Sequence, residues 1–387
     1  MRILLLTPFL PDEQASHGGG SYVGAICKSL RKRAELGLVH IQHLGEAPQQ
    51  PSEWSWLGAA RYEGAPGSPG HALRMLWRWR AQPLLVAKYQ SAAIPALIER
   101  ARREFKPDAA LVEMAQMAQY LPSLKGLPTI LTDHEAGHPA NAGTGLGAAA
   151  DRRDRRMWKR YVAQRYPLAD QIQAVTSQDA AALQAQLQRD VTVRPAALKP
   201  AGEACSPAAA PPKALFLGDY RHQPNHEAAR RLVAEVWPRI RACCADAELL
   251  LAGPHEAPIA DLGDEHGVRV LGFVEDLSAL MGSVRLLIAP LWSGGGFRVK
   301  NATALLAGLP VVTNALGARG CEAPEPGCSV REDPAALADA AVELLSSREA
   351  AGRAGEVARV WAVEHFSADK VADLQLERLS ELLDRAR

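Results

Sequence analysis

The sequence lacks the features that would place it within a membrane, in a disulfide framework or among zinc proteins. Its 387 residues contain no apolar run of the roughly 20 residues that a membrane-spanning helix needs. Its six cysteines form no CxxC pair, and two of them, Cys243 and Cys244, are adjacent, which suits neither an ordinary disulfide nor a zinc site. We therefore expect reduced thiols and a cytoplasmic protein.

An excess of charge of one sign is also missing. The formal net charge is +1, so no overall field attracts nucleic acid, and we expect no nucleic-acid partner. Hydrophobic residues make up 48% of the chain and charged residues 22%, which is the composition of a globular protein. Because 387 residues exceed one ordinary hydrophobic core, we predict two domains.

Short apolar runs alternate with longer amphipathic segments along the chain. The predicted strands are RILLLTPF, LGLVHIQHL, DAALVEMA, TILTDHE and QIQAVTS in the first half, and KALFLGDY, AELLLAG, VRVLGFV, VRLLIAPL and LPVVTN in the second. The predicted helices are Tyr22–Arg33, Ala92–Glu104, Asp151–Tyr166, His226–Arg241 and Pro334–Ser346. This alternation predicts an α/β protein with two Rossmann-like, doubly wound domains, each a parallel sheet covered on both faces.

The division between the domains is visible in the composition. Residues 193–213, VRPAALKPAGEACSPAAAPPK, are dense in Pro and Ala and have little amphipathic pattern, which indicates a linker. The predicted parts are a first domain at 1–195, a linker at 196–212, a second domain at 213–367 and a final helical segment at 368–387. The turn-rich segment GAPGSPGH at 64–71 predicts a loop. Ligands of such domains bind beyond the carboxyl ends of the strands, so we look for functional residues there.

A glycine-rich segment follows one of these strands, in PLWSGGGFRVKNATALLAGLPVV. A buried strand leads into Gly294, Gly295 and Gly296, and then into a helix predicted at Asn301–Gly308. Glycines let a phosphate approach the N–H groups at the start of a helix. Arg298 and Lys300 add a planar fork and a point charge, both suited to phosphate oxygens. We interpret the segment as a phosphate site, and the alternative is a surface loop with two solvated cations.

A second glycine cluster, SHGGGSYVGAICKSL, also follows a strand and opens a helix. Its backbone could therefore face the same cleft from the other domain. It has no GxGxxG spacing, and the chain has no P-loop GK[ST], which weakens a dinucleotide or ATP interpretation. A plain strand-to-helix turn is the alternative.

Another strand ends in TILTDHEAGH, which contains His134. A polar side chain at this position suits a hydrogen bond or proton transfer in a cleft, and a structural histidine bonded to the backbone is the alternative. His134 and His138 have the spacing of a metal-binding pair on a helix, but Gly137 and Pro139 argue against a helix here. We therefore expect no metal.

Two further strand ends of the second domain carry candidate ligand contacts. Gly218 ends the strand KALFLG, and the loop after it could place Arg221 or His222 over a ligand. In VLGFVEDL, Gly272 and Phe273 stand where backbone groups could contact the edge of a base.

The segment at 151–166, DRRDRRMWKRYVAQRY, is strongly basic. A basic helix that also carries Trp158 and Tyr161 could lie on anionic lipid, which would make the protein peripheral at the inner face of the membrane. The alternative is a solvated face whose cations pair with Asp151 and Asp154.

The second domain resembles the GT-B glycosyltransferases of family four. The likeness extends over most of residues 213–365, from KALFLGDYRHQPNHEAARRLVAEVWPRIRACCADAELLLAG through VRVLGFVEDLSALM to APLWSGGGFRVKNATALLAGLPVVT, in the order found in the family. In the first domain, HGGGSYVGAICKSL, KPDAALVE and TILTDHE look like its acceptor-side domain. The resemblance implies two Rossmann-like domains with a nucleotide-sugar in the cleft between them. It also implies a C-terminal helix, here 368–387, that crosses back to the first domain.

The resemblance assigns roles to the second-domain residues. Arg298 and Lys300 would hold the donor diphosphate, and Gly294–Gly296 would face the donor phosphate and sugar. Phe273 would lie near the base. As the nucleoside diphosphate leaves, it gains charge, and donors placed in advance stabilise that state more than the ground state.

The resemblance also assigns roles in the first domain. Gly18 and Gly19 would form a loop against the donor, and His134 would sit near the reacting sugar carbon. Family members usually act without a metal and with retention of anomeric configuration. Their sugar passes through an oxocarbenium-like state, as in glycoside hydrolysis.

The chain departs from the family at two positions. Family members carry two glutamates that frame the glycine loop, one contacting the donor sugar and the other binding ribose hydroxyls. Here the first falls at or beside Gly295 and the second at Thr303. A threonine hydroxyl cannot replace a carboxylate that binds two hydroxyls, so ribose contact at Thr303 differs from that of the family.

Together, these features predict a cytoplasmic, metal-independent glycosyltransferase that uses a nucleotide-diphosphate sugar and needs no other cofactor. The acceptor could be a sugar, a lipid-linked molecule, a protein or a small molecule. One alternative is a nucleotide-sugar epimerase of the same fold. Another is a binding or scaffold protein with impaired catalysis, suggested by Thr303 and Gly295.

Overall fold

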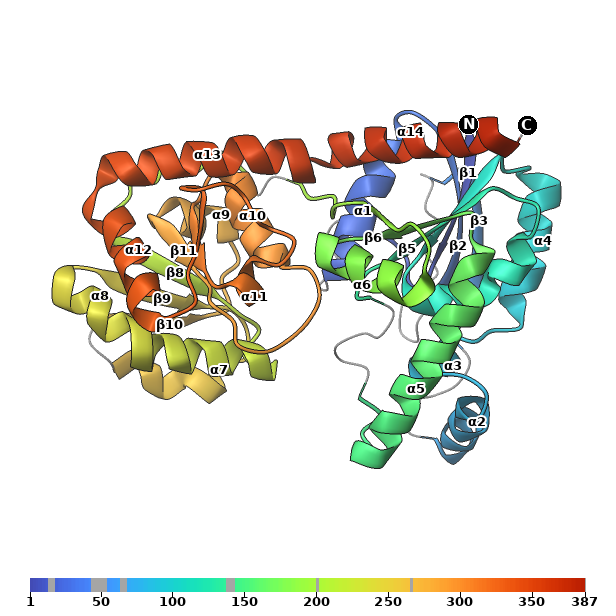
Figure 1. The fold of residues 1–387 in the computed structure, drawn as a ribbon, viewed down its shortest axis with the longest axis horizontal. Helices are drawn as coiled ribbons and strands as arrows, with labels where there is room; N and C mark the ends of the chain where they lie inside the picture. The colour runs from blue at the N-terminus through green and yellow to red at the C-terminus, as the bar shows by residue number, and fades with distance from the viewer. Residues whose placement is uncertain are drawn as a thin grey trace. The chain divides into compact units, whose positions relative to one another are not determined.

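The chain forms two compact units (Figure 1). The computed structural model describes residues 1–12, 18–42, 54–62, 68–136, 143–199, 202–264 and 267–386. Unit 1 comprises Met1–Ala197 together with Ala368–Arg387, and unit 2 comprises Leu198–Ser367. Each unit is a parallel sheet with helices on both faces, which confirms the predicted α/β class.

The sheet of unit 1 has seven strands in the order β3-β2-β1-β4-β5-β6-β7. Its strands are β1 (Arg2–Thr7), β2 (Glu35–Gln42), β3 (Trp56–Arg61), β4 (Ala109–Glu113), β5 (Thr129–Asp133), β6 (Gln171–Ala174) and β7 (Thr192–Val193). All of the strand pairs are parallel. The order reverses between β1 and β4, and ligands of doubly wound sheets bind at such a switch point.

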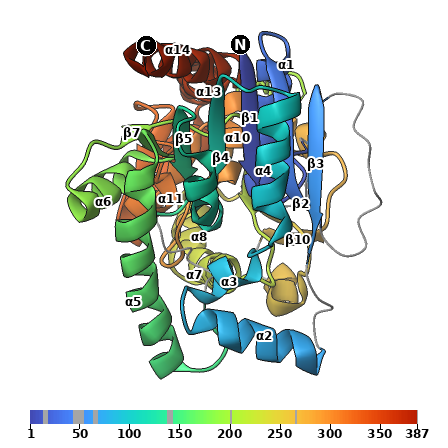
Figure 2. The same cartoon turned by 90° about the vertical axis from the view of Figure 1, so that its right-hand side faces the viewer.

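Helices cover the sheet of unit 1 (Figures 1 and 2). They are α1 (Gly18–Arg31), α2 (Pro69–Trp79), α3 (Leu84–Lys88), α4 (Ala93–Glu104), α5 (Ala148–Arg165), α6 (Ser177–Leu187) and α14 (Ala368–Ala386), with 3-10 turns at Ala115–Leu124 and Tyr166–Leu168. Buried residues of the strands and of the helices packed on one face of the sheet form a hydrophobic cluster that includes Trp158 and Tyr166.

The loop that we predicted at 64–71 is wrong in its last part. Pro69 begins α2, and the hydroxyl of Ser68 accepts a hydrogen bond from His71 N–H at 3.3 Å. A serine before a proline is a helix start signal, because serine caps the first turn and proline fits the first helical position. Residues 63–67 lie outside the described part of the chain.

The sheet of unit 2 has six strands in the order β10-β9-β8-β11-β12-β13. They are β8 (Lys213–Leu217), β9 (Glu248–Ala252), β10 (Val268–Gly272), β11 (Leu286–Ile288), β12 (Val311–Thr313) and β13 (Cys328–Val330). The helices are α7 (Gln223–Arg231), a π-helical turn (Leu232–Val236), α8 (Trp237–Cys243), α9 (Leu277–Gly282), α10 (Val299–Ala307), α11 (Ala315–Ala318), α12 (Pro334–Ser346) and α13 (Arg348–Phe366), with a 3-10 segment at Ala257–Asp264. Here the switch point lies between β8 and β11.

Every predicted strand and helix is present in the structure. The elements that were not predicted are the strands β3, β7 and β13 and the helices α2, α3, α6, α9, α11 and α13. β7 and β13 are only two and three residues long, which is too short for a pattern to appear. Residues 198–199 and 202–212, which we placed in the linker, belong to unit 2, where Cys205 N–H donates to Ala307 O at 2.7 Å. Among the helices of the described residues, none is both long and apolar enough to cross a membrane.

The last helix, α14, completes unit 1 by packing against α1. Val371 and Leu379 are buried on its inner face. At the edge of this contact, Asp369 pairs with Lys32 and Arg33, in both cases at 3.3 Å. The final helix thus contributes buried side chains to unit 1 and ion pairs to its surface.

Candidate functional site

The switch point of unit 2 gathers several of the predicted residues. Gly218 follows β8, and the loop of Gly294–Gly296 follows β11, so the two flank the switch point at the carboxyl edge of the sheet. α10 begins directly after this loop and carries Lys300 in its first turn. This is the place where a doubly wound sheet binds its ligand.

Arg298 holds the glycine loop in shape. Its guanidinium donates to Gly295 O at 2.9 Å, to Gly294 O at 3.2 Å and to Leu316 O at 3.0 Å. Gly294 and Gly296 have φ angles of 98° and 76°, a left-handed conformation that favours glycine. Arg298 therefore supports the loop in addition to bringing a positive charge to it.

Lys300 reaches across to the other side of the switch point. Its Nζ donates to Leu217 O, the last carbonyl of β8, at 3.1 Å. Burial lowers the pKa of Lys300 to about 8, with Asp219 opposing the shift and Arg298 adding to it. An anion bound beside Lys300 would favour the charged form and raise this pKa.

The start of α10 offers backbone donors and has no side-chain cap. Arg298 occupies the N-cap position and makes no capping hydrogen bond with its side chain. Asn301 Nδ2 donates to Gly317 O at 2.7 Å, which fixes the direction of the helix. The hydroxyl of Thr303 donates to Val299 O at 2.8 Å, so its hydrogen is directed at its own helix. Thr303 therefore supplies no carboxylate where the family has one.

The loop after β8 is organised by Asp219. Its carboxylate accepts from Arg221 N–H at 3.0 Å, pairs with the Arg221 guanidinium at 3.2 Å and contacts His255 Nδ1 at 3.0 Å. In the ligand-free structure the exposed side chain of Arg221 is thus paired with Asp219. The ends of β8 and β9 approach each other closely at Gly253. A Cβ at this position would lie only 1.7 Å from Gly218 O, so only glycine fits there.

Phe273 follows β10 with its side chain 70% exposed. It comes directly after Gly272, whose φ is 66°. The structure therefore leaves this ring available to a flat partner such as a base.

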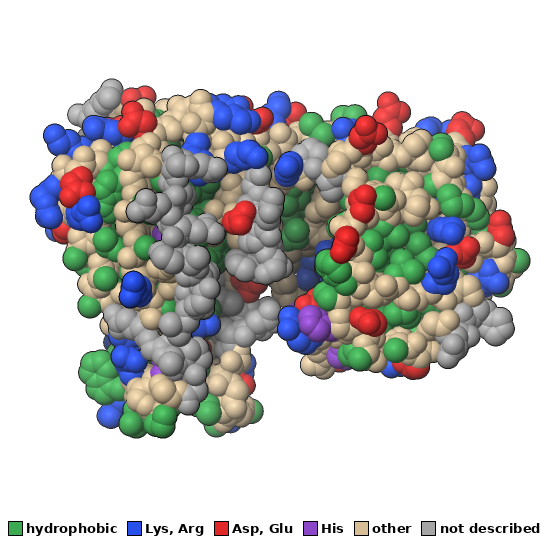
Figure 3. All heavy atoms as spheres, turned by 180° about the vertical axis from the view of Figure 1, so that it is seen from behind, with side chains coloured by type: hydrophobic (Ala, Val, Ile, Leu, Met, Phe, Trp, Pro, Cys, Tyr) green, Lys and Arg blue, Asp and Glu red, His purple; other side chains and the backbone are tan. Residues whose placement is uncertain are grey.

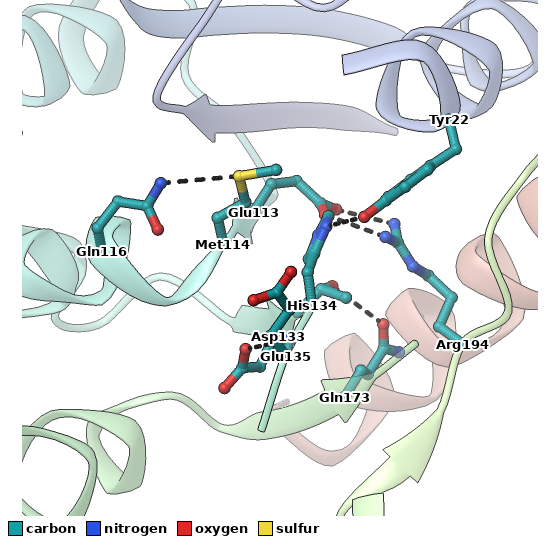
Figure 4. Close-up of polar contacts among 10 residues, drawn as sticks. Tyr22, Glu113, Met114, Gln116, Asp133, His134, Glu135, Gln173 and Arg194 are labelled. Carbon is teal, nitrogen blue, oxygen red and sulfur yellow. Dashed lines mark hydrogen bonds and ion pairs between the residues drawn. The ribbon is translucent and has the colours of Figure 1, made fainter. Parts of the chain in front are cut away.

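In unit 1, Gly18 and Gly19 lie in the first turn of α1 and not in a loop. Residues 13–17, which precede them, lie outside the described part of the chain. The other predicted residue, His134, directly follows β5. It belongs to a buried polar network at the carboxyl edge of the sheet (Figure 4).

Glu113 is the centre of this network. Its carboxylate accepts two hydrogen bonds from the Arg194 guanidinium, at 2.8 and 3.0 Å, and lies 2.8 Å from His134 Nε2. His134 Nδ1 lies 2.6 Å from the hydroxyl of Tyr22, whose ring stacks on the imidazole. The exposed fractions of Tyr22 and His134 are 6%, and those of Glu113 and Arg194 are 1%. Residues of α1, β4 and β5 and the segment after β7 thus meet beside the switch point of unit 1.

The electrostatics of this network assign its protons. Burial raises the pKa of Glu113, but Arg194 and His134 outweigh burial, so the carboxyl pKa lies below its ordinary value and the group is ionised. A carboxylate only accepts, so His134 Nε2 must donate to it. Burial raises the pKa of Tyr22, so its hydroxyl keeps its proton and shares a hydrogen bond with His134 Nδ1. Both nitrogens of His134 are thus engaged within unit 1.

Tyr22, Glu113 and Arg194 were not among the functional residues predicted from the sequence. The sequence does contain a signal for two of them. Glu113 is a single charged residue at the end of the apolar run AALVE, and Arg194 is a single charged residue in VTVRPAAL. A buried charge needs a partner, and two such positions with opposite signs suggest a pair. The alternative for His134 was a structural histidine bonded to the backbone. Its hydrogen-bond partners are the side chains of Tyr22 and Glu113 and not the backbone, so that part of the alternative is wrong.

The interpretation of 151–166 needs a correction. Trp158 and Tyr161 are 1% and 5% exposed and pack in the core of unit 1, so these aromatic rings do not face lipid. Asp154 accepts from Trp79 Nε1 at 2.6 Å and from Leu84 N–H at 2.8 Å, so it does not neutralise the basic face. In the described part of the chain, no group of three or more His, Cys, Asp or Glu side chains could hold a metal ion, and His138 lies outside that part.

Comparisons with known proteins agree with this geometry. The family described as glycosyl transferases group 1 matches residues 211–347, which include Gly218, Arg298 and Lys300. No curated protein sequence matches the chain.

Solved structures resemble the chain along its whole length. Sucrose-phosphate synthase from Thermosynechococcus elongatus is 17% identical with a TM-score of 0.69, and the match covers 100% of both chains. HepE of Anabaena, solved with UDP and glucose, is 16% identical with a TM-score of 0.64, and the match covers 98% of this chain and 100% of that one. The α,α-trehalose 6-phosphate synthase of Burkholderia multivorans is 11% identical with a TM-score of 0.65, with 100% of both chains covered.

At such low identities the structural likeness shows the fold, and the family match covers the part of unit 2 that contains the glycine loop, Arg298 and Lys300. The resemblance inferred from the sequence is thereby confirmed. The chain has the GT-B fold, and its residues 211–347 match the group 1 glycosyl transferases.

Proposed function

We propose that this protein is a glycosyltransferase that moves a sugar from a nucleotide-diphosphate sugar to an acceptor. One observation carries the proposal: Arg298 and Lys300 stand at the start of α10, behind a glycine loop, at the switch point of a sheet that matches the group 1 family. The UDP complexes of HepE support a nucleotide-sugar as the donor.

The residues of unit 2 suit the diphosphate of such a donor. The loop Gly294–Gly296 brings bare backbone to the ligand, and the first turn of α10 supplies N–H groups with the positive end of the helix dipole. Lys300 supplies a cation that gains stability when a phosphate arrives. Phe273 would pack near the base, with Gly218 and Arg221 beside the same edge. As the diphosphate leaves, these fixed donors stabilise its added charge.

In unit 1, we propose that His134 stands near the reacting sugar carbon and that the start of α1, at Gly18 and Gly19, faces the donor. His134 would contact a sugar hydroxyl through Nδ1 once Tyr22 releases that nitrogen. The hydrogen bond to Glu113 would keep the imidazole oriented.

The finer properties rest on the family resemblance. We propose transfer without a metal and with retention of anomeric configuration, in glycan or glycoconjugate biosynthesis in the cytoplasm. The acceptor would be a sugar, a lipid-linked molecule, a protein or a small molecule. Its chemistry is not specified by any contact in the described residues.

A donor screen tests this proposal. Calorimetric titration with UDP, GDP, ADP and dTDP should detect binding of at least one of them. Mass spectrometry with the matching nucleotide sugars and a host extract should then detect a glycosylated product. Failure of every nucleoside diphosphate to bind would contradict the donor assignment.

Impaired catalysis is a second candidate, favoured by Thr303. Its hydroxyl is bonded to Val299 O, and it offers no carboxylate to the ribose. This candidate predicts nucleotide binding without turnover in the same screen, whereas the transferase predicts both.

The depressed pKa of Lys300 predicts that nucleotide binding depends on pH. The free protein has a Lys300 pKa of about 8, and a bound diphosphate raises it. Affinity should therefore be almost full at pH 7 and should fall by about tenfold between pH 7 and pH 9. The phosphates of the ligand are already ionised over this range. Calorimetry at a series of pH values measures the effect.

The matched variant for this experiment is Lys300→Arg, whose charge does not titrate below pH 9. Its affinity should be constant from pH 7 to pH 9. A pH profile that is equally steep in both proteins would assign the dependence to another group.

A further inference from the structure

Helix α2 presents apolar side chains to the surface. Leu73, Leu76 and Trp77 are 69%, 48% and 70% exposed, and they recur at a spacing that places them on one face of the helix. The helix carries no buried residue. Surface helices normally direct such a stripe towards the core, so this orientation requires a different explanation.

The opposite side of α2 is already packed. Arg78 Nη1 donates to Gln90 O at 2.9 Å, and Trp79 Nε1 donates to the buried Asp154 of α5 at 2.6 Å. The guanidinium of Arg153 lies 4.4 Å from the centroid of the Trp79 ring. These contacts anchor α2 to α5, so the stripe faces outward in the folded unit.

Basic residues surround the stripe. On α5 the exposed cations are Arg152, Arg153, Arg155, Arg156, Lys159 and Arg160, and on or next to α2 they are Arg74 and Arg80. Within the part of the chain that the structure describes, no ion pair joins these cations to a carboxylate. Figure 3 shows hydrophobic and basic side chains together at the lower end of unit 1, where α2 lies. The surface is thus apolar and cationic at once.

A cavity of about 270 Å³ lies between α5 and the turn after α2. Its walls include four arginines, at positions 80, 153, 160 and 165, and none of its lining residues is acidic. Four arginines that line one hollow suit a phosphate group, because a guanidinium group can contact phosphate oxygens through paired N–H donors.

We propose that the surface formed by α2 and the basic face of α5 binds a membrane that contains anionic phospholipids. Leu73, Leu76 and Trp77 would enter the region between headgroups and acyl chains, where leucine and tryptophan are favoured. The arginines of α5 would contact lipid phosphates, and one headgroup would occupy the arginine cavity. A basic surface without an apolar stripe would suit any polyanion, whereas this combination suits a lipid interface. The inference concerns this surface alone and does not rest on the proposed function.

Vesicle sedimentation of the full chain tests the proposal. The protein should sediment with vesicles of phosphatidylcholine and phosphatidylglycerol and should remain free with phosphatidylcholine alone. We expect vesicle affinity to fall by more than about tenfold in the triple variant Leu73→Ser, Leu76→Ser, Trp77→Ser, because this variant has no apolar side chains to insert. We expect vesicle affinity to fall by more than about a hundredfold in the triple variant Arg152→Glu, Arg155→Glu, Arg156→Glu, because three positive charges near the membrane become negative.

Two matched control variants distinguish binding through this surface from non-specific binding to vesicles. The first removes three exposed apolar residues elsewhere, with the substitutions Leu168→Ser, Val360→Ser and Val363→Ser. The second reverses three exposed positive charges elsewhere, with the substitutions Arg103→Glu, Arg239→Glu and Arg348→Glu. Both controls should bind within about twofold of the parent chain. The substituted side chains are exposed, and circular dichroism on heating verifies that each variant is folded. Lack of binding to the anionic vesicles by the parent chain, or equal losses in the controls, would overturn the proposal.

Discussion

Replacing Lys300 with alanine should weaken nucleoside diphosphate binding by about 30-fold at pH 7. A charge-assisted hydrogen bond contributes about 2 kcal/mol, and each 1.4 kcal/mol is about a factor of ten in affinity. In the ligand-free protein, Lys300 Nζ donates to Leu217 O. Losing that one contact should leave the glycine loop intact, because Arg298 holds the loop. Titration calorimetry of Lys300→Ala measures the change.

The control for this substitution is Lys213→Ala. Lys213 begins β8, the strand whose last carbonyl contacts Lys300, and it pairs with Glu248 at 3.1 Å. It therefore removes the same charge from the other end of the same strand, and its affinity should stay within about twofold of the parent. Unchanged binding in Lys300→Ala would exclude the diphosphate site.

Adding Arg298→Ala to Lys300→Ala should reduce affinity by about a thousandfold. Part of that loss is structural, because Arg298 bonds to the carbonyls of Gly294, Gly295 and Leu316. Comparing each single variant with the double variant separates the two contributions. If the loop shape dominates, Arg298→Ala alone will account for most of the loss.

The second large effect concerns the buried network of unit 1. Replacing Glu113 with glutamine should cost about 3–5 kcal/mol of stability, because the Arg194 guanidinium is then left charged and buried without an anion. Glu113→Gln keeps the shape of the side chain, so the loss reports charge and not volume. Hydrogen exchange measured by mass spectrometry should show faster exchange in β4 and β5, while the strands of unit 2 serve as an internal reference.

Two further variants define the origin of this loss. Glu113→Leu combined with Arg194→Met removes both charges and should recover much of the stability, since an apolar pair of similar volume can replace a buried ion pair. Glu104→Gln, at an exposed carboxylate paired with Arg100 at 2.9 Å, should leave the stability almost unchanged, because solvent screens this pair. Equal losses from Glu113→Gln and Glu104→Gln would contradict a special role for the buried pair.

The sequence predicted the sheets and the loop of unit 2 because their signals are local. Apolar runs mark the strands, and in PLWSGGGFRVKNAT the strand, glycines, cations and helix follow one another directly. The Glu113 network has no such local signal. Glu113 is separated by 81 positions from Arg194 and by 21 from His134, and His134 by 112 from Tyr22. Only the folded sheet brings these residues together.

Helix α2 was missed for a different reason. Its start signal, Ser68-Pro69, lies at the end of a segment whose Gly and Pro content predicts a loop. Its apolar residues form a stripe, but the sequence cannot show that this stripe faces outward. That direction follows from the contacts of Trp79 with Asp154 and Arg153, which depend on the packing of α5.

The place of α14 in unit 1 has a consequence for the order of synthesis and folding. Unit 2 is continuous in the chain, whereas unit 1 needs residues from both sides of it. On the ribosome, the strands of unit 1 emerge first, but the α1 face that α14 covers stays open until all of unit 2 has been translated. Unit 2 can therefore finish folding before the unit that precedes it, and during that interval the incomplete unit 1 is the part of the nascent chain most in need of protection from aggregation.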